Sequence, residues 1–487
     1  MFDLNISLVF IFSVIVLNAS QCGAKSDDRS SVQIGDNEYI GSEKVVLDKT
    51  VHVFTGIPYA EPPLQELRFK KPLPVTRNGV FESNEWPKAC PQIDTNVPQS
   101  EDCLKLNVWT TDLSASKPVM VWFHGGGFQY GSGHNGEVLA VAGDVVVVTL
   151  NYRLGALGFL YGDRDDAPGN MGLWDQVLAL EWVNDNIRYF GGNQQQITLF
   201  GFSAGSRSIS LHLLSEHSRQ LFRNAIMMSG SALSLLTNSD KSYVHNIYLK
   251  LAKHVGCSAG DTGFTDDVMT CLRGVPHEKL VSAQHSAEVL DSNFAFFPNY
   301  IFGDPFMREG PLDMVDHKET KKKINLLLGT TEDEGSWIWN KINENKALTH
   351  LTKTEAIEEL ESIFNGLKVD PKIDGQSVAK FYMNKIPDTN PDVFMKTVGI
   401  AVGDFFITCP ALKFADIIYR ADPKHNKVYG YYWTSKGRSC DEWAGACHGS
   451  DVGPALGYPF RSTKSSDLQR DVSMNFMKTI AYFAKYK

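Results

Sequence analysis

The sequence lacks the features of nucleic-acid-binding, repetitive or disordered proteins. Its 487 residues include 47 Lys and Arg against 56 Asp and Glu, which gives a formal net charge of −9. The longest basic run, Lys321–Lys323, is too short to form an electrostatic footprint for nucleic acid. No repeat period or low-complexity tract is present. Because 43% of the residues are hydrophobic, we expect a large folded core.

Closely spaced cysteine pairs are also missing. No Cys-x-x-Cys motif occurs, which argues against zinc and thioredoxin-type redox sites. No pattern indicates a bound metal or an organic cofactor, so we expect none. The eight cysteines are better explained as disulfide partners in an exported protein, and they stand at positions 22, 90, 103, 257, 271, 409, 440 and 447.

A long apolar segment occurs only at the N-terminus. The run Ile6–Leu17 is too short to span a bilayer but suits the apolar region of a signal peptide. A buried N-terminal strand is the alternative. Small residues follow the run, so we predict a signal peptide over residues 1–24 and a secreted protein. No later run reaches about 18 apolar residues, so no transmembrane helix is expected.

Short apolar runs alternate with helical patterns in the remaining chain. Continuous runs rich in β-branched residues suit parallel strands that are covered on both faces. Helices are expected over residues 173–190, 206–214, most of 354–418, and 467–486. The alternation predicts an α/β fold with a central, mostly parallel sheet and helices on both faces. The expected strands are 118–123, 144–150, 197–200, 225–228, 325–329 and 427–433.

The segment Gly201-Phe202-Ser203-Ala204-Gly205 matches the Gly-x-Ser-x-Gly nucleophile elbow. In this motif the serine lies on a strained turn between a strand and a helix, and the glycines allow the backbones to approach closely. An expected strand precedes the segment and an expected helix follows it. Although an ordinary glycine turn is the alternative, this context favours Ser203 as a nucleophile.

A second glycine-rich segment, His124-Gly125-Gly126-Gly127-Phe128, directly follows the expected strand 118–123. Backbone N–H groups in such a loop can donate to the oxyanion of a tetrahedral intermediate, as in the HGGG motif of lipases and esterases. A flexible loop without a function is the alternative. Both motifs in this order indicate acyl-transfer chemistry.

A nucleophilic serine needs a general base and a carboxylate that orients it. His448 lies in a loop of small residues after the last expected strand, where an imidazole would be accessible. Glu332, Asp333 and Glu334 follow the strand 325–329, and spacing alone does not choose among these carboxylates.

Taken together, the chain resembles a type-B carboxylesterase of the carboxylesterase/cholinesterase family from about Asn37 to its last residue. The resemblance includes the two glycine motifs and four further segments, which are 54–60 (FTGIPYA), 101–109 (EDCLKLNVW), 151–155 (NYRLG) and 169–173 (GNMGL). It implies the α/β-hydrolase fold and the hydrolysis of carboxylic esters through an acyl-enzyme.

Carried over to this sequence, the resemblance makes Ser203 the nucleophile, Glu334 the acid and His448 the base. It assigns the oxyanion donors to the N–H groups of Gly126, Gly127 and Ala204.

The same resemblance places Ser229 near these residues and pairs Glu101 with Arg153 in a structural ion pair. It also implies the disulfides Cys90–Cys103 and Cys257–Cys271, each contributing about 3 kcal/mol in the chain-entropy model.

The chain departs from the family pattern at several positions. Phe202 stands where the family usually has Glu, and the segment between Cys90 and Cys103 holds no Trp that could bind a choline cation. We therefore expect neutral, apolar esters rather than choline esters. Residues 25–487 are expected to form one α/β-hydrolase domain that lacks the family's C-terminal elements. The pairing of Cys22, Cys409, Cys440 and Cys447 stays open: Cys440 and Cys447 could pair together, or one of them could pair with Cys409.

Two other functions remain possible at this stage. The first is a catalytically inactive family member that acts in binding or adhesion, against which Ser203, Glu334 and His448 are all retained. The second is an acyltransferase or lipase on the same fold, which differs only in the acyl acceptor or chain length. The expected partner is a small-molecule ester. No pattern indicates nucleic acid or an oligomeric state.

Overall fold

The structure is a computed structural model, and part of the chain is described in it. The described residues are 29–93, 96–234, 239–257, 263–286, 288–290, 299–317, 319–343, 350–367, 371–384, 386–387, 391–437 and 440–487. The predicted signal peptide (residues 1–24) and Cys22 lie outside these residues.

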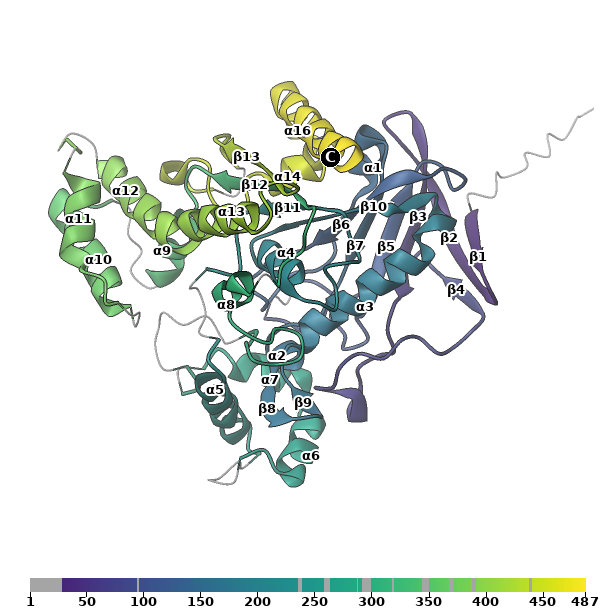
Figure 1. The fold of residues 1–487 in the computed structure, drawn as a ribbon, viewed down its shortest axis with the longest axis horizontal. Helices are drawn as coiled ribbons and strands as arrows, with labels where there is room; N and C mark the ends of the chain where they lie inside the picture. The colour runs from purple at the N-terminus through teal and green to yellow at the C-terminus, as the bar shows by residue number, and fades with distance from the viewer. Residues whose placement is uncertain are drawn as a thin grey trace, which may run out of the picture.

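The described residues form one large mixed sheet at the centre of the molecule (Figure 1). Its strand order is β1-β2-β3-β5-β7-β6-β10-β11-β12-β13, and β4 pairs with β2. The strands from β7 to β13 in this order are parallel, while β1, β2, β3 and β5 pair antiparallel. A separate pair is formed by β8 and β9. The strands are β1 (Arg29–Ile34), β2 (Asn37–Val46), β3 (Lys49–Pro58), β4 (Val80–Glu82), β5 (Lys105–Thr110), β6 (Lys117–Phe123), β7 (Val146–Leu150), β8 (Tyr161–Arg164), β9 (Ala167–Pro168), β10 (Gly192–Phe202), β11 (Asn224–Met228), β12 (Asn325–Thr331) and β13 (Lys427–Trp433).

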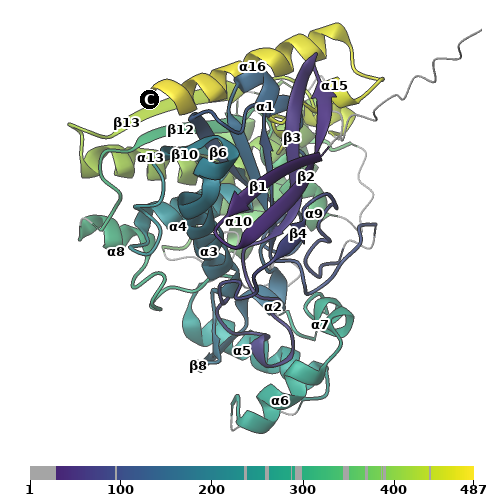
Figure 2. The ribbon, with the colours of Figure 1, turned by 90° about the vertical axis from the view of Figure 1, so that its right-hand side faces the viewer.

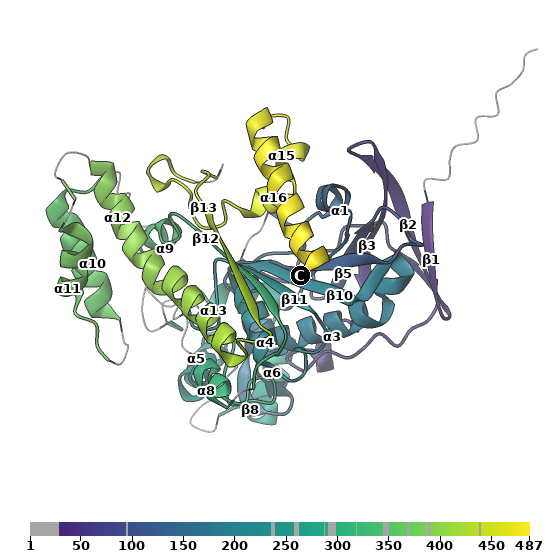
Figure 3. The same ribbon diagram turned by 45° about the horizontal axis from the view of Figure 1, so that its top comes forward.

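Helices cover both faces of this sheet, as Figures 2 and 3 show. One face carries α3, α4 and α13, and the other carries α1 and α16. The α-helices are α1 (Glu137–Gly143), α2 (Gly155–Phe159), α3 (Met171–Asn186), α4 (Ala204–Leu214), α5 (Lys241–His254), α6 (Asp266–Gly274), α7 (His277–Ala283), α8 (Pro311–Asp316), α9 (Ser336–Ile342), α10 (Lys353–Gly366), α11 (Gly375–Met383), α12 (Pro391–Gly403), α13 (Cys409–Ala421), α14 (Val452–Ala455), α15 (Tyr458–Arg461) and α16 (Asp467–Tyr486).

The two-sided cover explains why the central strands read as continuous apolar runs. Val121 of β6 belongs to the core beneath α3 and α4, whereas its neighbour Trp122 belongs to the core beneath α16. Successive side chains of a strand point to opposite faces, so a strand covered on both faces needs apolar residues at every position. The central, mostly parallel sheet predicted from this pattern is confirmed, and so is the α/β-hydrolase fold that the family resemblance implies.

One helical stretch among the described residues, Val393–Ala421, is long and apolar enough to cross a membrane by length and composition. It joins α12 and α13 through a π-helical segment (Asp404–Thr408). More than half of its most apolar window is buried inside the molecule. A buried core helix can have the same length and composition, so these two properties do not by themselves indicate a membrane span.

The predicted ion pair between Glu101 and Arg153 is wrong. Arg153 pairs with Asp175 of α3, with its Nη2 2.6 Å and its Nε 2.8 Å from the two carboxylate oxygens. Glu101 instead pairs with Arg68, whose Nε lies 2.8 Å from Glu101 Oε2. The side chain of Asp175 is fully buried, so α3 supplies the carboxylate that neutralises Arg153.

The structure contains three disulfides among the described residues. Cys90–Cys103 and Cys257–Cys271 confirm the pairings implied by the family resemblance. The third, Cys440–Cys447, resolves an open alternative, and it leaves Cys409 as an exposed free cysteine at the start of α13. This third bond closes the segment directly before His448.

Replacing Asp175 with Asn should destabilise the fold strongly. The substitution leaves the Arg153 guanidinium, 3% exposed, without a countercharge, and such a loss typically costs about 3–5 kcal/mol. Urea unfolding measures this loss. The control is Asp416→Asn, which breaks the exposed Arg420–Asp416 pair and should cost less than about 1 kcal/mol. Equal losses in the two variants would contradict a buried structural pair.

Candidate active site

Ser203 lies at the sharp turn between β10 and α4. Its backbone has φ 55° and ψ −115°, a conformation that is rare for a residue with a side chain. A Cβ on Gly205 would lie 2.0 Å from the carbonyl oxygen of Phe123 in β6, and one on Gly201 would lie 2.8 Å from the same atom. Both glycines are therefore needed for the close approach of β6, β10 and α4. The strand–turn–helix arrangement predicted around Ser203 is present.

His448 and Glu334 form a short, buried hydrogen bond. The distance from His448 Nδ1 to Glu334 Oε2 is 2.6 Å, and their side chains are 6% and 1% exposed. The other carboxylate oxygen of Glu334 accepts a hydrogen bond from the backbone N–H of Thr331 at 2.7 Å. Glu334 is thus held at both oxygens, and it fixes one nitrogen of the imidazole ring.

A short parallel bridge beyond the ends of β12 and β13 brings these two residues together. The N–H of Asp333 donates to the Ala446 carbonyl oxygen at 3.0 Å, and the N–H of Ala446 donates to Asp333 Oδ2 at 3.0 Å. Asp333 and Glu332 both lie near Lys396, at 3.4 and 3.6 Å. Of the three carboxylates that the sequence left open, only Glu334 bonds to His448 among the described residues.

The imidazole of His448 lies between two aromatic rings. Its centroid is 4.5 Å from that of Phe202 and 5.6 Å from that of Trp337, with which it stacks at an interplanar angle of 25°. Phe202 directly precedes Ser203, so this contact joins the elbow to the His448 loop. The Ser203 hydroxyl forms no hydrogen bond to His448 in the described residues. In sites without substrate, such catalytic hydrogen bonds are often long or poorly aligned. The sequence reasoning missed Trp337, whose one signal was its place a helical turn after Glu334.

The glycine-rich loop after β6 packs against the same turn. A Cβ on Gly125 would lie 2.7 Å from the Phe202 ring, and Gly126 has φ 108°, which favours glycine. Within the described part of the chain, the N–H groups of Gly126 and Gly127 have no hydrogen-bond acceptor. Ala204 begins α4, where backbone N–H groups also lack intrahelical acceptors. These groups can donate to an oxygen atom bound next to Ser203.

Two further polar side chains lie buried in this region. Ser229 follows β11 with φ 58°, is 1% exposed, and its hydroxyl has no hydrogen-bond partner. Asp451 is fully buried, accepts a hydrogen bond from the Tyr431 hydroxyl at 2.6 Å, and leaves its Oδ1 without a partner. Burial is the largest cause that raises the pKa of Asp451 to about 6, and the charge of Glu334 raises it further. The sequence gave no signal for Asp451 beyond its position three residues after His448.

Other histidines lie in different surroundings. His317 and His425 are exposed and each lies within hydrogen-bond distance of a neighbouring carboxylate. Buried His124 and His212 have pKa values lowered to about 3, chiefly by burial. No group of three or more His, Cys, Asp or Glu that could hold a metal occurs in the described residues.

The raised pKa of Asp451 predicts a pH-dependent stability. The folded pKa of about 6 exceeds the ordinary value of 3.8, so ionisation of this group opposes folding. Its contribution to the free energy of unfolding therefore falls as pH rises from about 4 to about 6, by up to about 3 kcal/mol. Asp451→Asn should remove this dependence, because an amide oxygen still accepts from Tyr431 but does not ionise. Urea unfolding at pH 4.5 and pH 7 measures it, and an unchanged slope in the variant would contradict the assignment.

Comparison with known proteins adds a family to this geometry. The model of the carboxylesterase family matches residues 30–487. A cholinesterase of Mus musculus is 35% identical over 481 residues, which cover 92% of this chain and 77% of the relative. An acetylcholinesterase of Leptinotarsa decemlineata is 32% identical over 491 residues, covering 91% and 76%. Acetylcholinesterase-1 of Trittame loki is 34% identical over 478 residues, covering 90% and 82%.

Proposed function

Because this chain belongs to the carboxylesterase family and is a carboxylic ester hydrolase, we propose that Ser203, His448 and Glu334 form its catalytic triad. The observation that supports this most directly is the buried 2.6 Å hydrogen bond between His448 and Glu334. It lies beside the turn that carries Ser203, through the contact of Phe202 with His448. The proposal gives the three residues the roles of base, orienting carboxylate and nucleophile.

In this mechanism, Ser203 Oγ attacks the ester carbonyl carbon while His448 Nε2 takes the hydroxyl proton. Glu334 holds the proton on Nδ1 and stabilises the imidazolium that forms. The N–H groups of Gly126, Gly127 and Ala204 bind the oxyanion. The imidazolium then protonates the leaving alcohol, which gives an acyl-enzyme on Ser203. Water attacks this ester with the same base, and the carboxylic acid is released as the serine is restored.

Replacing Ser203 with Ala should abolish both turnover and covalent labelling. Loss of a nucleophilic serine lowers kcat by at least about 10³-fold, because the acyl-enzyme has no atom on which to form. Hydrolysis of a short-chain aryl ester and labelling by a fluorophosphonate probe measure the two effects. Ser210→Ala, a buried serine on the same helix, should retain both. A Ser203→Ala variant that is still labelled would contradict the assignment, and a folded wild-type protein without turnover would favour a binding role.

We further propose that the preferred substrates are neutral, apolar esters. Next to Ser203 stands Phe202, an apolar ring packed on His448, where the family usually has a carboxylate. The site therefore lacks a negative charge that would attract a cationic choline group. The names of the relatives point to choline esters as the rival, and Trp337 offers an aromatic ring for a cation. However, Trp337 stacks on His448, which leaves one fewer face for a ligand.

The substitution Phe202→Glu tests this preference. Wild-type kcat/KM should be higher for phenyl butyrate than for butyrylcholine, and the variant should shift this ratio towards butyrylcholine by about tenfold. The new carboxylate also favours the imidazolium, so the acid limb of the pH–rate profile should move to higher pH. The control is Phe202→Gln, whose side chain has the shape of Glu but no charge, and it should not produce either shift. A wild-type preference for butyrylcholine would contradict the proposed substrate class.

We also propose that the protein is secreted, with residues 25–487 as one hydrolase domain. Three disulfides among the described residues support export, because such bonds persist in oxidising compartments.

A further inference from the structure

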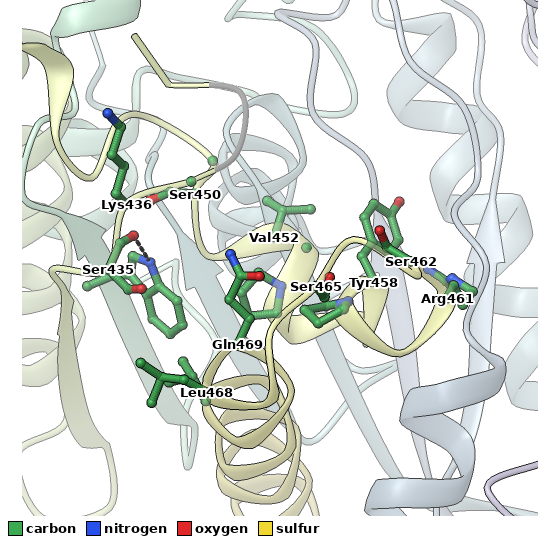
Figure 4. A pocket seen from close by; sticks show the side chains of 17 residues that line it. Ser435, Lys436, Ser450, Val452, Tyr458, Arg461, Ser462, Ser465, Leu468 and Gln469 are labelled. Atoms are coloured by element: carbon green, nitrogen blue, oxygen red, sulfur yellow. Dashed lines mark hydrogen bonds between the residues drawn. The ribbon is translucent and has the colours of Figure 1, made fainter. Parts of the chain in front are cut away.

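A cavity of about 650 Å³ is lined in part by Gly449, Ser450 and Val452, which closely follow His448 in the chain (Figure 4). Its walls come from the chain after β13, from residues 449–454, from α15 and from the first turns of α16. This volume is within the range of small-molecule sites. Ser203, Glu334 and His448 are not among its lining residues, so it is separate from the proposed catalytic site.

One part of the cavity lining is apolar. Trp433, Leu468 and Val472 line it, and Leu468 is 72% exposed in a chain whose apolar residues are otherwise mostly buried. The indole N–H of Trp433 donates to the carbonyl oxygen of Ser435 at 2.8 Å, which fixes the ring at one end of the cavity. An aliphatic chain would remove this apolar surface from water.

The charged groups of the lining are all cationic. Lys436 and Arg461 lie at opposite ends of the cavity (Figure 4), and no Asp or Glu is among the described residues that line it. This contrasts with the net charge of −9 of the whole chain. The Arg461 guanidinium lies over the Tyr458 ring and donates one hydrogen bond, to the carbonyl oxygen of Asn135. Glu137 interacts with Arg461 from outside the lining.

A polar group of the lining is also left unsatisfied. The hydroxyl of Ser450 is buried and has no hydrogen-bond partner. Ser450 follows Gly449, and a Cβ on Gly449 would lie 2.8 Å from the Phe202 ring. Only the short segment Gly449–Ser450 therefore separates the cavity from Phe202, which borders the proposed catalytic site.

We propose that this cavity binds an aliphatic carboxylate, with the chain over Trp433 and Leu468 and the carboxylate against a lining cation. A lining with an apolar part, cationic groups and no acidic group suits a single negative charge on a hydrocarbon chain. Ester hydrolysis releases acids of this class, so a product could occupy the cavity beside the His448 loop. Binding itself does not depend on the proposed triad.

The test is calorimetric titration with dodecanoate of wild-type protein whose catalytic serine has been blocked by a fluorophosphonate, with unblocked protein titrated in parallel. Decanoate and octanoate should bind progressively more weakly, by about fourfold for each methylene removed. Dodecanol and dodecyltrimethylammonium should bind at least about tenfold more weakly than dodecanoate, because dodecanol carries no negative charge and dodecyltrimethylammonium is itself a cation. Failure of labelling would count against the triad only, since the unblocked protein still reports on the cavity.

Two variants locate the site. Val472→Trp puts an indole ring into the apolar part of the cavity, where the hydrocarbon chain would lie, and should abolish binding. Lys436→Gln, at an exposed position, should weaken the binding of dodecanoate by at least about threefold and leave that of dodecanol unchanged. Lys464→Gln, an exposed lysine outside the lining, should change neither. Absence of dodecanoate binding to the wild type, equal affinity for dodecanol, or binding retained in a folded Val472→Trp variant would each overturn the proposal.

Discussion

The hydrogen bond between His448 and Glu334 is the interaction on which the proposed chemistry depends. Both side chains are almost fully buried, so neither can rely on water for its hydrogen bonds. The second carboxylate oxygen of Glu334 accepts a hydrogen bond from the backbone N–H of Thr331, the last residue of β12. The pair is therefore anchored to the sheet, and the imidazole ring has its orientation fixed before any substrate arrives.

The sheet places the parts of this site at one edge. β6, β10, β11, β12 and β13 run parallel, and the glycine loop, Ser203, Ser229, Glu334 and the His448 loop follow their carboxyl ends. In open α/β sheets ligands bind at this edge. The bridge between Asp333 and Cys447 extends the pairing of β12 with β13, so the register of two strands sets the positions of Glu334 and His448.

The His448 loop is constrained from several directions. The Cys440–Cys447 disulfide closes the chain immediately before His448, and Phe202 and Trp337 pack on its ring. After it, Gly449 packs on Phe202 and Asp451 accepts from Tyr431 of β13. The proposed carboxylate cavity lies on the far side of this same segment, so one short stretch of chain borders both sites.

The sequence by itself determined the elements that carry local signals. The apolar runs predicted the parallel strands because both faces are covered, the pattern 467–486 predicted α16 to its last residue, and the Gly201–Gly205 spacing predicted the turn at Ser203. Glycine and β-branched residues act on the backbone next to them, so such features can be read without a partner. The choice of Glu334 among three adjacent carboxylates needed either the family resemblance or the structure.

Only the tertiary structure decided which distant groups meet. Arg153 pairs with Asp175 rather than Glu101, Cys440 pairs with Cys447, and Trp337 and Asp451 lie close to His448, none of which spacing could establish. The physical reason is that ion pairs, ring contacts and burial depend on the register and packing of whole elements. A residue type fixes what a side chain can do, and the fold fixes what it touches.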